Sequence, residues 1–353
     1  MDNILYTGLF RSPTSWAKVN RKITLSLINQ NNNIFVYEQK GFLFNQDIYL
    51  DSKIKKRIKK IDGSYNDLCF IYPPVYKNLK GNKKFSILTI ESTKVPEMWK
   101  NAINKHIDTI IVPSRFCKNT LIESNINIPI RVIPFGVDHS IFNPKNNKIT
   151  DKFRFLFIGT PHYRKGISEL TDAFKDVFSN NKDVELYIKM PYLPINNKLK
   201  SWEIANIPET VSGYENIVID SKPIGDKEIA DLIASANVVI QPSYSEGFGL
   251  SILEAMAMEK LIITTLWSGE SEFVTNRNSL IVKNDWIDSG NIQYGEILKG
   301  AKMKRPDIKH LKEIMEYSFL DYCELSGIRA NALITSKKYT WEKTAGSILK
   351  ILQ

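Results

Sequence analysis

Two glutamates, Glu246 and Glu254, lie eight positions apart across a turn that contains Gly247 and Gly249. The preceding residues, 237–241, are typical of a buried strand, and the residues after the turn predict a helix. Glycines at such a turn let the backbone approach a ligand closely, and the N–H groups of a helix start attract an anion. The two carboxylates would reach different parts of one long ligand. This chemistry suits a partly anionic, hydroxyl-rich molecule such as a nucleotide sugar.

A second candidate cluster combines two cations with glycines. Arg164 and Lys165 stand between a predicted strand and a predicted helix, with Gly159 and Gly166 on either side. Cations at a helix start can stabilise the charge that grows on a leaving diphosphate. The metal-binding motif Asp-x-Asp does not occur, and the nearest spacing, at 183–185, opens a predicted strand. We therefore expect neither a metal ion nor a cofactor, only a co-substrate.

The segment from Glu246 to Glu254 resembles the Glu-x7-Glu signature of the family 4 glycosyltransferases, which are retaining enzymes with the GT-B fold. The likeness covers nearly the whole chain and is best from about Asp108 to Val282. Further segments that match in the expected order are 111–116, 132–138, 157–159 with 164–166, and Gly269 with Glu272.

The resemblance implies roles for individual residues. Lys165 would contact the donor diphosphate, with Arg164 as a second contact. Glu246 would contact the donor sugar, and Glu254 the ribose hydroxyls. The remaining donor-binding positions that the resemblance implies are Gly8, Gly159 and the backbone N–H groups of Gly247, Phe248, Gly249 and Leu250. The implied outcome is retention by front-face attack, and double displacement through an enzymic nucleophile stays open.

The sequence departs from the family pattern at several positions. Thr160 stands where many members have arginine, so Arg164, or His162 when protonated, would supply the missing charge. The active-site histidine of many members has no counterpart, and Glu91, after the predicted strand 85–90, is the candidate replacement. Glu259 follows the signature helix where glycine is common, which concerns helix termination.

Alternating apolar and helical patterns predict an α/β protein with parallel sheets. The GT-B architecture that the resemblance implies has two Rossmann-like domains facing each other across a cleft, with a C-terminal helix crossing back to the first. The expected domains are an acceptor-side domain at 1–145, a nucleotide-sugar domain at 146–325 and a bracing helical segment at 326–353. Residues 191–208 predict an irregular loop with a short helix.

Positive charge is concentrated in the first part of the chain. Residues 1–150 contain 23 Lys and Arg against 11 Asp and Glu, whereas residues 151–353 contain 25 against 27. This asymmetry predicts an anionic acceptor or surface, such as a membrane glycolipid, a glycan or nucleic acid. Residues 53–61 predict a basic amphipathic helix. Alternatively, its isoleucines pack on the core and its lysines are merely solvated.

The chain lacks an apolar run long enough to span a bilayer and begins without the features of a signal peptide. Its three cysteines are widely spaced. We therefore expect a cytoplasmic protein, with peripheral membrane contact possible.

The leading hypothesis is a metal-independent retaining hexosyl- or pentosyltransferase of glycan or glycolipid synthesis. The alternatives are sugar transfer onto modified DNA bases and a catalytically silent GT-B protein that binds an anionic polymer. A phosphorylase would need a cofactor lysine or a phosphate site that the sequence does not reveal.

Overall fold

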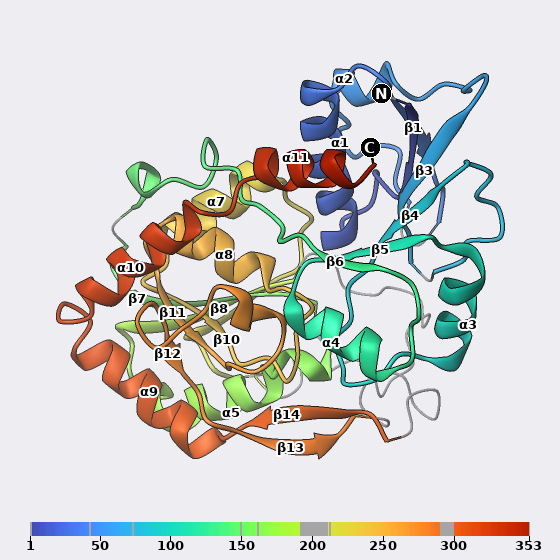
Figure 1. Cartoon of the computed structure of the whole chain (residues 1–353). Coiled ribbons are helices and arrows are strands. Elements are labelled where there is room, and N and C mark those ends of the chain that lie inside the picture. The colour runs from blue at the N-terminus through green and yellow to red at the C-terminus, as the bar shows by residue number, and fades with distance from the viewer. Residues whose placement is uncertain are drawn as a thin grey trace. The chain divides into compact units, whose positions relative to one another are not determined.

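The computed structural model (Figure 1) describes residues 2–41, 44–72, 74–148, 150–160, 162–190, 211, 213–289 and 300–352. The chain divides into two compact units. The first comprises Met1–Ile90, Lys94–Gly136 and Tyr339–Gln353, and the second comprises Glu91–Thr93 and Val137–Lys338. The domain limits expected at 145 and 325 stay predictions. The segment at 191–208, expected to be an irregular loop, lies outside the described residues.

The first unit contains a parallel six-stranded sheet in the order β2-β1-β3-β4-β5-β6. The chain runs outward from β1 to β2 and then crosses to the other side of β1, so the order reverses between β1 and β3. In open α/β sheets, ligands bind outside the carboxyl ends of the strands at such a reversal. The strands are β1 (Asn3–Gly8), β2 (Ile34–Glu38), β3 (Tyr65–Phe70), β4 (Lys84–Ile87), β5 (Thr109–Val112) and β6 (Ile130–Val132).

The helices of the first unit are α1 (Ser15–Gln30), α2 (Ser52–Lys55), α3 (Glu97–His106), α4 (Arg115–Glu123) and α11 (Trp341–Leu352). The C-terminal α11 packs against α1 (Figure 1). The Gln30 amide donates to the Glu342 carbonyl at 3.0 Å. The Trp341 ring lies 6.1 Å from the Phe135 ring. The predicted return of the C-terminal helix to the first half of the chain is confirmed.

The basic segment 53–61 is helical only at its start. The helix α2 ends at Lys55, and the following residues run beside the edge strand β2, where the Val36 N–H donates to the Arg57 carbonyl at 2.8 Å. Ile54 is buried but Ile58 is 38% exposed. The helix predicted across the whole segment is therefore wrong, because the free edge of β2 offers the backbone another set of hydrogen-bond partners.

The second unit contains another parallel six-stranded sheet, in the order β12-β11-β10-β7-β8-β9. Every residue of β10 and β11 is buried, as expected for the central strands of a sheet covered on both faces. The strands are β7 (Phe153–Ile158), β8 (Val184–Lys189), β9 (Ile217–Asp220), β10 (Val238–Gln241), β11 (Leu261–Thr264) and β12 (Leu280–Ile281).

The helices of the second unit are α5 (Ile167–Phe178), α7 (Asp226–Ala234), α8 (Leu250–Ala257), α9 (Ile308–Leu320) and α10 (Ser326–Ser336). Helix α9 packs against α5, and α10 packs against α8. An antiparallel pair, β13 (Asn284–Asp288) and β14 (Lys302–Pro306), was not predicted from the sequence. Two parallel Rossmann-like sheets thus confirm the predicted fold class. No helix in the described ranges has the length and apolar character needed to cross a membrane.

Candidate functional site

Two turns at the carboxyl edge of the second sheet lie against each other. The turn between β7 and α5 contains a short 3-10 helix, η2 (Tyr163–Lys165), followed by Gly166 at φ +67°. A Cβ on Gly166 would lie 2.0 Å from the Pro242 carbonyl oxygen, so this position requires glycine for space as well as for conformation. The Tyr244 N–H donates to the Arg164 carbonyl at 2.6 Å. These contacts hold the cations of the first turn next to the loop that carries Glu246.

The carboxylate of Glu246 forms the centre of a buried charge cluster. Lys165 Nζ lies 2.6 Å from Glu246 Oε1, and the Ser243 hydroxyl donates to the same oxygen at 2.7 Å. Arg164 Nη1 lies 3.4 Å from the other oxygen and donates to the Ser245 carbonyl at 2.9 Å. Glu246 and Arg164 are only 5% and 8% exposed. The structure thus brings together three residues that the sequence singled out in two separate segments.

The cations set the ionisation of this cluster. Burial by itself would raise the pKa of Glu246, but the charges of Lys165 and Arg164 outweigh it and lower that pKa to about 2. Burial and the same two cations lower the pKa of His162 to about 3. His162 Nδ1 accepts a hydrogen bond from the Arg164 backbone N–H at 3.3 Å. His162 Nδ1 is therefore an acceptor in this arrangement, and its expected role as a donor when protonated stays a prediction.

A second buried acid, Glu270, lies behind Glu246. The Glu246 N–H donates to Ser268 Oγ at 2.9 Å, and the Ser268 hydroxyl donates to Glu270 Oε2 at 2.6 Å. Glu270 is fully buried, and burial raises its pKa to about 7. Sequence reasoning placed Gly269 and Glu272 in this loop but missed Ser268 and Glu270. Their position after β11, the strand beside β10, was the signal that could have found them.

Glu91 contacts the cluster through Arg164. Its Oε1 lies 2.6 Å from Arg164 Nη2, and its side chain is 17% exposed. Arg164 therefore has a carboxylate on each side, Glu91 and Glu246. This geometry makes Glu91 a counterion that orients the guanidinium, and its expected role as a replacement for a catalytic histidine stays a prediction.

The start of α8 lies four residues after Glu246. Gly249 caps the helix at φ +90°, and Leu250 is its first residue. The Phe248 ring is 3% exposed and packs 5.1 Å from the Phe273 ring. Its side chain is thus committed to the core, and any contact that Phe248 makes with a ligand comes from its backbone. Glu254, in the middle of α8, is 4% exposed.

Two further glycines among the predicted donor-binding residues, Gly159 and Gly8, are closely packed against side chains. A Cβ on Gly159, at the end of β7, would lie 3.2 Å from the Phe157 ring. A Cβ on Gly8, at the end of β1 in the first unit, would lie 2.6 Å from the Asn20 side chain. The donor-binding roles of both glycines stay predictions. Across the described ranges, no group of three or more His, Cys, Asp or Glu side chains is placed to hold a metal ion.

Residues 138–293 match the family model described as "Glycosyl transferases group 1". The D-inositol 3-phosphate glycosyltransferase of Arthrobacter sp. (strain FB24) is 29% identical over 194 residues, which cover 51% of this chain and 45% of that protein. The chain spans about half the length of the curated relatives it matches.

Solved structures share the fold across the whole chain. Sucrose-phosphate synthase from Thermosynechococcus elongatus has a TM-score of 0.74 at 16% identity, covering 99% of this chain and 98% of its own. Anabaena HepE, solved in complex with UDP-glucose, has a TM-score of 0.67 at 14% identity, covering 100% and 99%. Residues 138–293 are thus similar to the group 1 (family 4) glycosyltransferases, and the whole chain shares the GT-B fold of these solved structures.

Proposed function

We propose that the protein transfers a hexosyl or pentosyl group from a nucleotide-diphosphate sugar to an acceptor hydroxyl, with retention and without a metal ion. The observation that carries this proposal is the convergence of Arg164, Lys165 and Glu246 beside the start of α8. Two cations and a helix start form a site for a diphosphate, and the buried carboxylate can accept hydrogen bonds from sugar hydroxyls.

The reaction breaks the bond between the anomeric carbon and the diphosphate oxygen, and it forms a bond from that carbon to the acceptor oxygen. In front-face attack the acceptor proton passes to the leaving diphosphate oxygen. Lys165 and Arg164 would offset the negative charge that develops there. Glu246 is ionised at every pH near neutrality because its pKa is about 2, so it serves as a hydrogen-bond acceptor and not as an acid.

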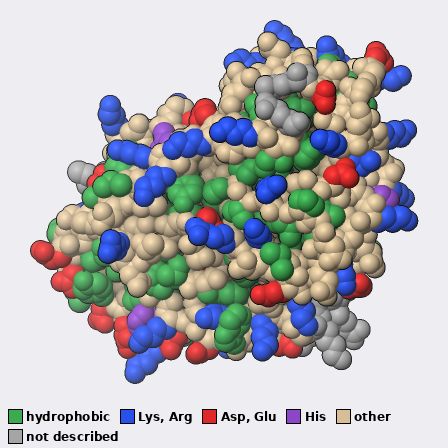
Figure 2. All heavy atoms as spheres, in the orientation of Figure 1, with side chains coloured by type: hydrophobic (Ala, Val, Ile, Leu, Met, Phe, Trp, Pro, Cys, Tyr) green, Lys and Arg blue, Asp and Glu red, His purple; other side chains and the backbone are tan. Residues whose placement is uncertain are grey.

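The acceptor belongs, in this proposal, to an anionic membrane surface, as in glycolipid synthesis. Support comes from a basic surface around α2 that consists of Lys55, Lys56, Lys59 and Lys60 with exposed Tyr49 and Ile58. Lys55 Nζ lies 5.7 Å from the Tyr49 ring centroid, and Tyr49 is 75% exposed. Figure 2 shows Lys and Arg side chains on the part of the molecule where Figure 1 places α2. Lysines beside exposed aromatic and aliphatic groups suit an interface with anionic lipid.

Thermal unfolding with UDP, GDP and ADP, each with a chelator present, tests the donor site. HepE was solved with UDP-glucose, so UDP is the first nucleotide to test. We expect one nucleotide to raise the melting temperature of the wild type, to have no effect on Lys165→Ala and to have a smaller effect on Glu254→Ala. Turnover of the matching nucleotide sugar should continue in the chelator.

Nucleotide stabilisation that is equal in the wild type and in Lys165→Ala would overturn the proposed donor site. Stabilisation without any donor turnover would favour the catalytically silent alternative. Turnover that stops on chelation and returns with Mg²⁺ or Mn²⁺ would overturn metal independence alone.

A further inference from the structure

The turn after β11 holds the backbone of Glu246 from both sides. This turn contains a short 3-10 helix, η4 (Gly269–Glu272). Ser268 Oγ accepts from the Glu246 N–H at 2.9 Å, and the Gly269 N–H donates to the Glu246 carbonyl at 2.8 Å. A Cβ on Gly269 would lie 2.2 Å from the Gly247 carbonyl oxygen, so the two backbones are in close contact. The turn after β11 therefore fixes the position of Glu246.

Glu270 connects this turn to Glu246 by two routes. The Ser268 hydroxyl donates to Glu270 Oε2 at 2.6 Å and accepts from the Glu246 N–H, which forms the first route. On the second route, Glu270 Oε1 lies 3.5 Å from Thr265 Oγ1, and the Thr265 hydroxyl donates to the Ser243 carbonyl at 2.6 Å. The Ser243 hydroxyl then donates to Glu246 Oε1 at 2.7 Å. Glu270 thus lies where both routes from Glu246 meet.

The hydrogen atoms of this network fit a protonated Glu270. A threonine hydroxyl has one hydrogen, and the short bond to the Ser243 carbonyl uses it, because a carbonyl can only accept. Thr265 Oγ1 therefore offers a lone pair to Glu270. A carboxylate would be repelled there, whereas a protonated carboxyl group donates to Thr265 with one oxygen and accepts from Ser268 with the other.

The charges around Glu270 also favour its protonated form. Burial raises its pKa to about 7, and the negative charge of Glu246 adds to this rise, while hydrogen bonds from Ser268 only partly offset it. Helix α8 begins next to Glu270, since a Cβ on Gly249 would lie 3.4 Å from Glu270 Cβ. The charged side chains on the surrounding elements are Glu246 before α8, Glu254 on α8, Glu272 on η4, and Arg164 and Lys165, which pair with Glu246.

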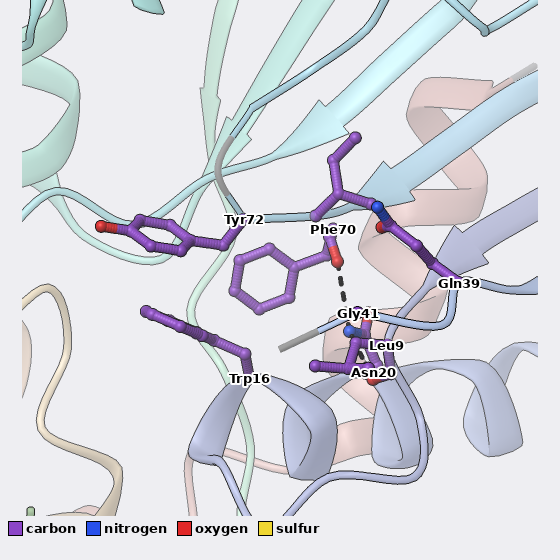
Figure 3. Close-up of a pocket in the computed structure, with 8 residues that line it drawn as sticks. Leu9, Trp16, Asn20, Gln39, Gly41, Phe70 and Tyr72 are labelled. Atoms are coloured by element: carbon purple, nitrogen blue, oxygen red, sulfur yellow. Dashed lines mark hydrogen bonds between the residues drawn. The ribbon is translucent and has the colours of Figure 1, made fainter. Parts of the chain in front are cut away.

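The first unit joins two of its strands with a side chain that is always neutral. The Asn20 amide donates to the Leu9 carbonyl after β1 at 3.0 Å and to the Phe70 carbonyl at the end of β3 at 3.1 Å (Figure 3). Its oxygen accepts from the Tyr6 hydroxyl at 2.7 Å. An amide can donate and accept at every pH, but a carboxyl group can do both only while it carries a proton. The joint that Glu270 forms in the second unit therefore depends on pH.

We infer that Glu270 is a positioning residue that, in its protonated form, holds residues 245–249 in place for the donor diphosphate. Loss of the proton has two effects. The bond to Thr265 is lost, and a second negative charge then lies behind Glu246, where it opposes the binding of a diphosphate. The effect on the donor rests on the proposed function, whereas the effect on residues 245–249 does not.

Hydrogen exchange of the full chain without ligand tests the positioning directly. The readout is the protection of the backbone amides of residues 245–249 at pH 6 and pH 8.5, corrected for the intrinsic exchange rate at each pH. Glu270→Gln keeps a donor and an acceptor but does not titrate. We expect the wild type to match Glu270→Gln at pH 6 and to be about five-fold less protected at pH 8.5, the effect of one hydrogen bond. Glu270→Ala should be poorly protected at both pH values.

Calorimetric titration at the same two pH values tests the consequence for the donor. The probe is the nucleotide that stabilises the wild type, taken from UDP, GDP and ADP. Because the terminal phosphate itself titrates, the affinities of wild type and variant are compared as a ratio at each pH. We expect equal affinities at pH 6, and at pH 8.5 we expect the wild type to bind about five-fold more weakly than Glu270→Gln.

Glu185→Gln is the matched control. It removes another buried carboxylate of the same sheet, one that pairs with Arg154 at the start of β8, away from the turns at the carboxyl ends of the strands. This variant should follow the wild type in both measurements and at both pH values.

Equal protection of the wild type and Glu270→Gln at pH 8.5 would overturn this inference, as would a Glu270→Gln variant that behaves like Glu270→Ala. If exchange changes as expected while nucleotide affinity does not, the positioning would not extend to the donor. If exchange changes as expected but no nucleotide binds, the proposed function fails and Glu270 still holds residues 245–249. Nucleotide binding with unchanged exchange would leave the proposed function standing without this role for Glu270.

Discussion

Lys165 Nζ and the Ser243 hydroxyl both contact one oxygen of Glu246, at 2.6 and 2.7 Å. Lys165 comes from the turn after β7, and Ser243 precedes the turn that leads to α8. One carboxylate oxygen therefore holds the ammonium group in place before any ligand arrives. Such preorganisation saves the ligand from having to order a long, flexible side chain.

Removal of the Lys165 charge should lower the rate of glycosyl transfer strongly. Its effect on the stability of the fold should be small. We expect Lys165→Ala to lower turnover by about 10²–10³-fold, since one preorganised donor contributes that much in comparable sites. Lys165→Arg keeps the charge but changes its shape and should recover only part of the rate. Initial rates with the nucleotide sugar measure the effect. Lys175→Ala is the matched control, because Lys175 pairs with Asp172 on the same helix, α5, away from Glu246.

Glu270 should make the protein less stable as the pH rises. Its pKa is raised from 4.5 to about 7 in the folded protein, so the folded state binds the proton more tightly. Stability from this group is greatest below pH ~4.5 and is lost between ~4.5 and ~7, by on the order of 3 kcal/mol. Urea unfolding of the wild type and of Glu270→Gln at pH 5 and pH 8 measures this loss of stability. Between the two pH values the variant should lose less stability than the wild type. The exposed Glu228→Gln is the control, and identical pH dependence in all three proteins would contradict this assignment.

Glu259 adopts a backbone conformation that suits glycine. It follows α8 with φ +56°, in the left-handed region that costs a non-glycine residue about 1–2 kcal/mol. Glu259→Gly should therefore stabilise the protein by about 0.5–1 kcal/mol, after allowance for the greater freedom of glycine in the unfolded chain. Asn125, at φ +60°, is the matched control, because asparagine tolerates this region and Asn125→Gly should gain less. Equal gains in chemical denaturation would show that strain at Glu259 is not the cause.

The basic surface around α2 should govern binding to anionic membranes. Lys55, Lys56 and Lys60 are exposed, and their replacement by glutamate reverses the local charge. We expect sedimentation with vesicles containing phosphatidylserine to fall at least ten-fold in the triple variant and to weaken with salt in the wild type. The control reverses Lys182, Lys227 and Lys309, three exposed lysines of the second unit. Equal loss in both triple variants would indicate net charge alone, and no loss in either would remove the membrane from the proposal.

The strands and the turn that carries Glu246 could be predicted because each signal is local, whereas the donor-binding roles stay predictions. Residues 238–240 form an unbroken apolar run, and the glycines and glutamates of the following turn stand within one short segment. The approach of Lys165 to Glu246 could be expected only from the parallel order of β7 and β10, in which the carboxyl ends of the two strands meet.

What escaped prediction depends on contacts between distant segments. No local pattern marks Glu91 as the partner of Arg164 or Ser268 as the link between two acids. The basic segment after Lys55 has a helical period, yet its backbone forms a hydrogen bond with Val36 of β2. This tertiary contact, and not the local pattern, determines its conformation. The pairing of β13 with β14 likewise joins residues whose polar sequence gives little strand signal.

Because α11 packs against α1, the first unit is assembled from both ends of the chain. A ribosome that has released Val137–Lys338 has supplied nearly all of the second unit, while the first still lacks Trp341 and the helix that begins with it. During synthesis the later unit can therefore complete its core before the earlier one, and the face of α1 stays uncovered until Trp341–Leu352 has emerged. A premature stop just before Tyr339 would leave the second unit whole and the face of α1 bare, as a surface for chaperones or proteases to bind.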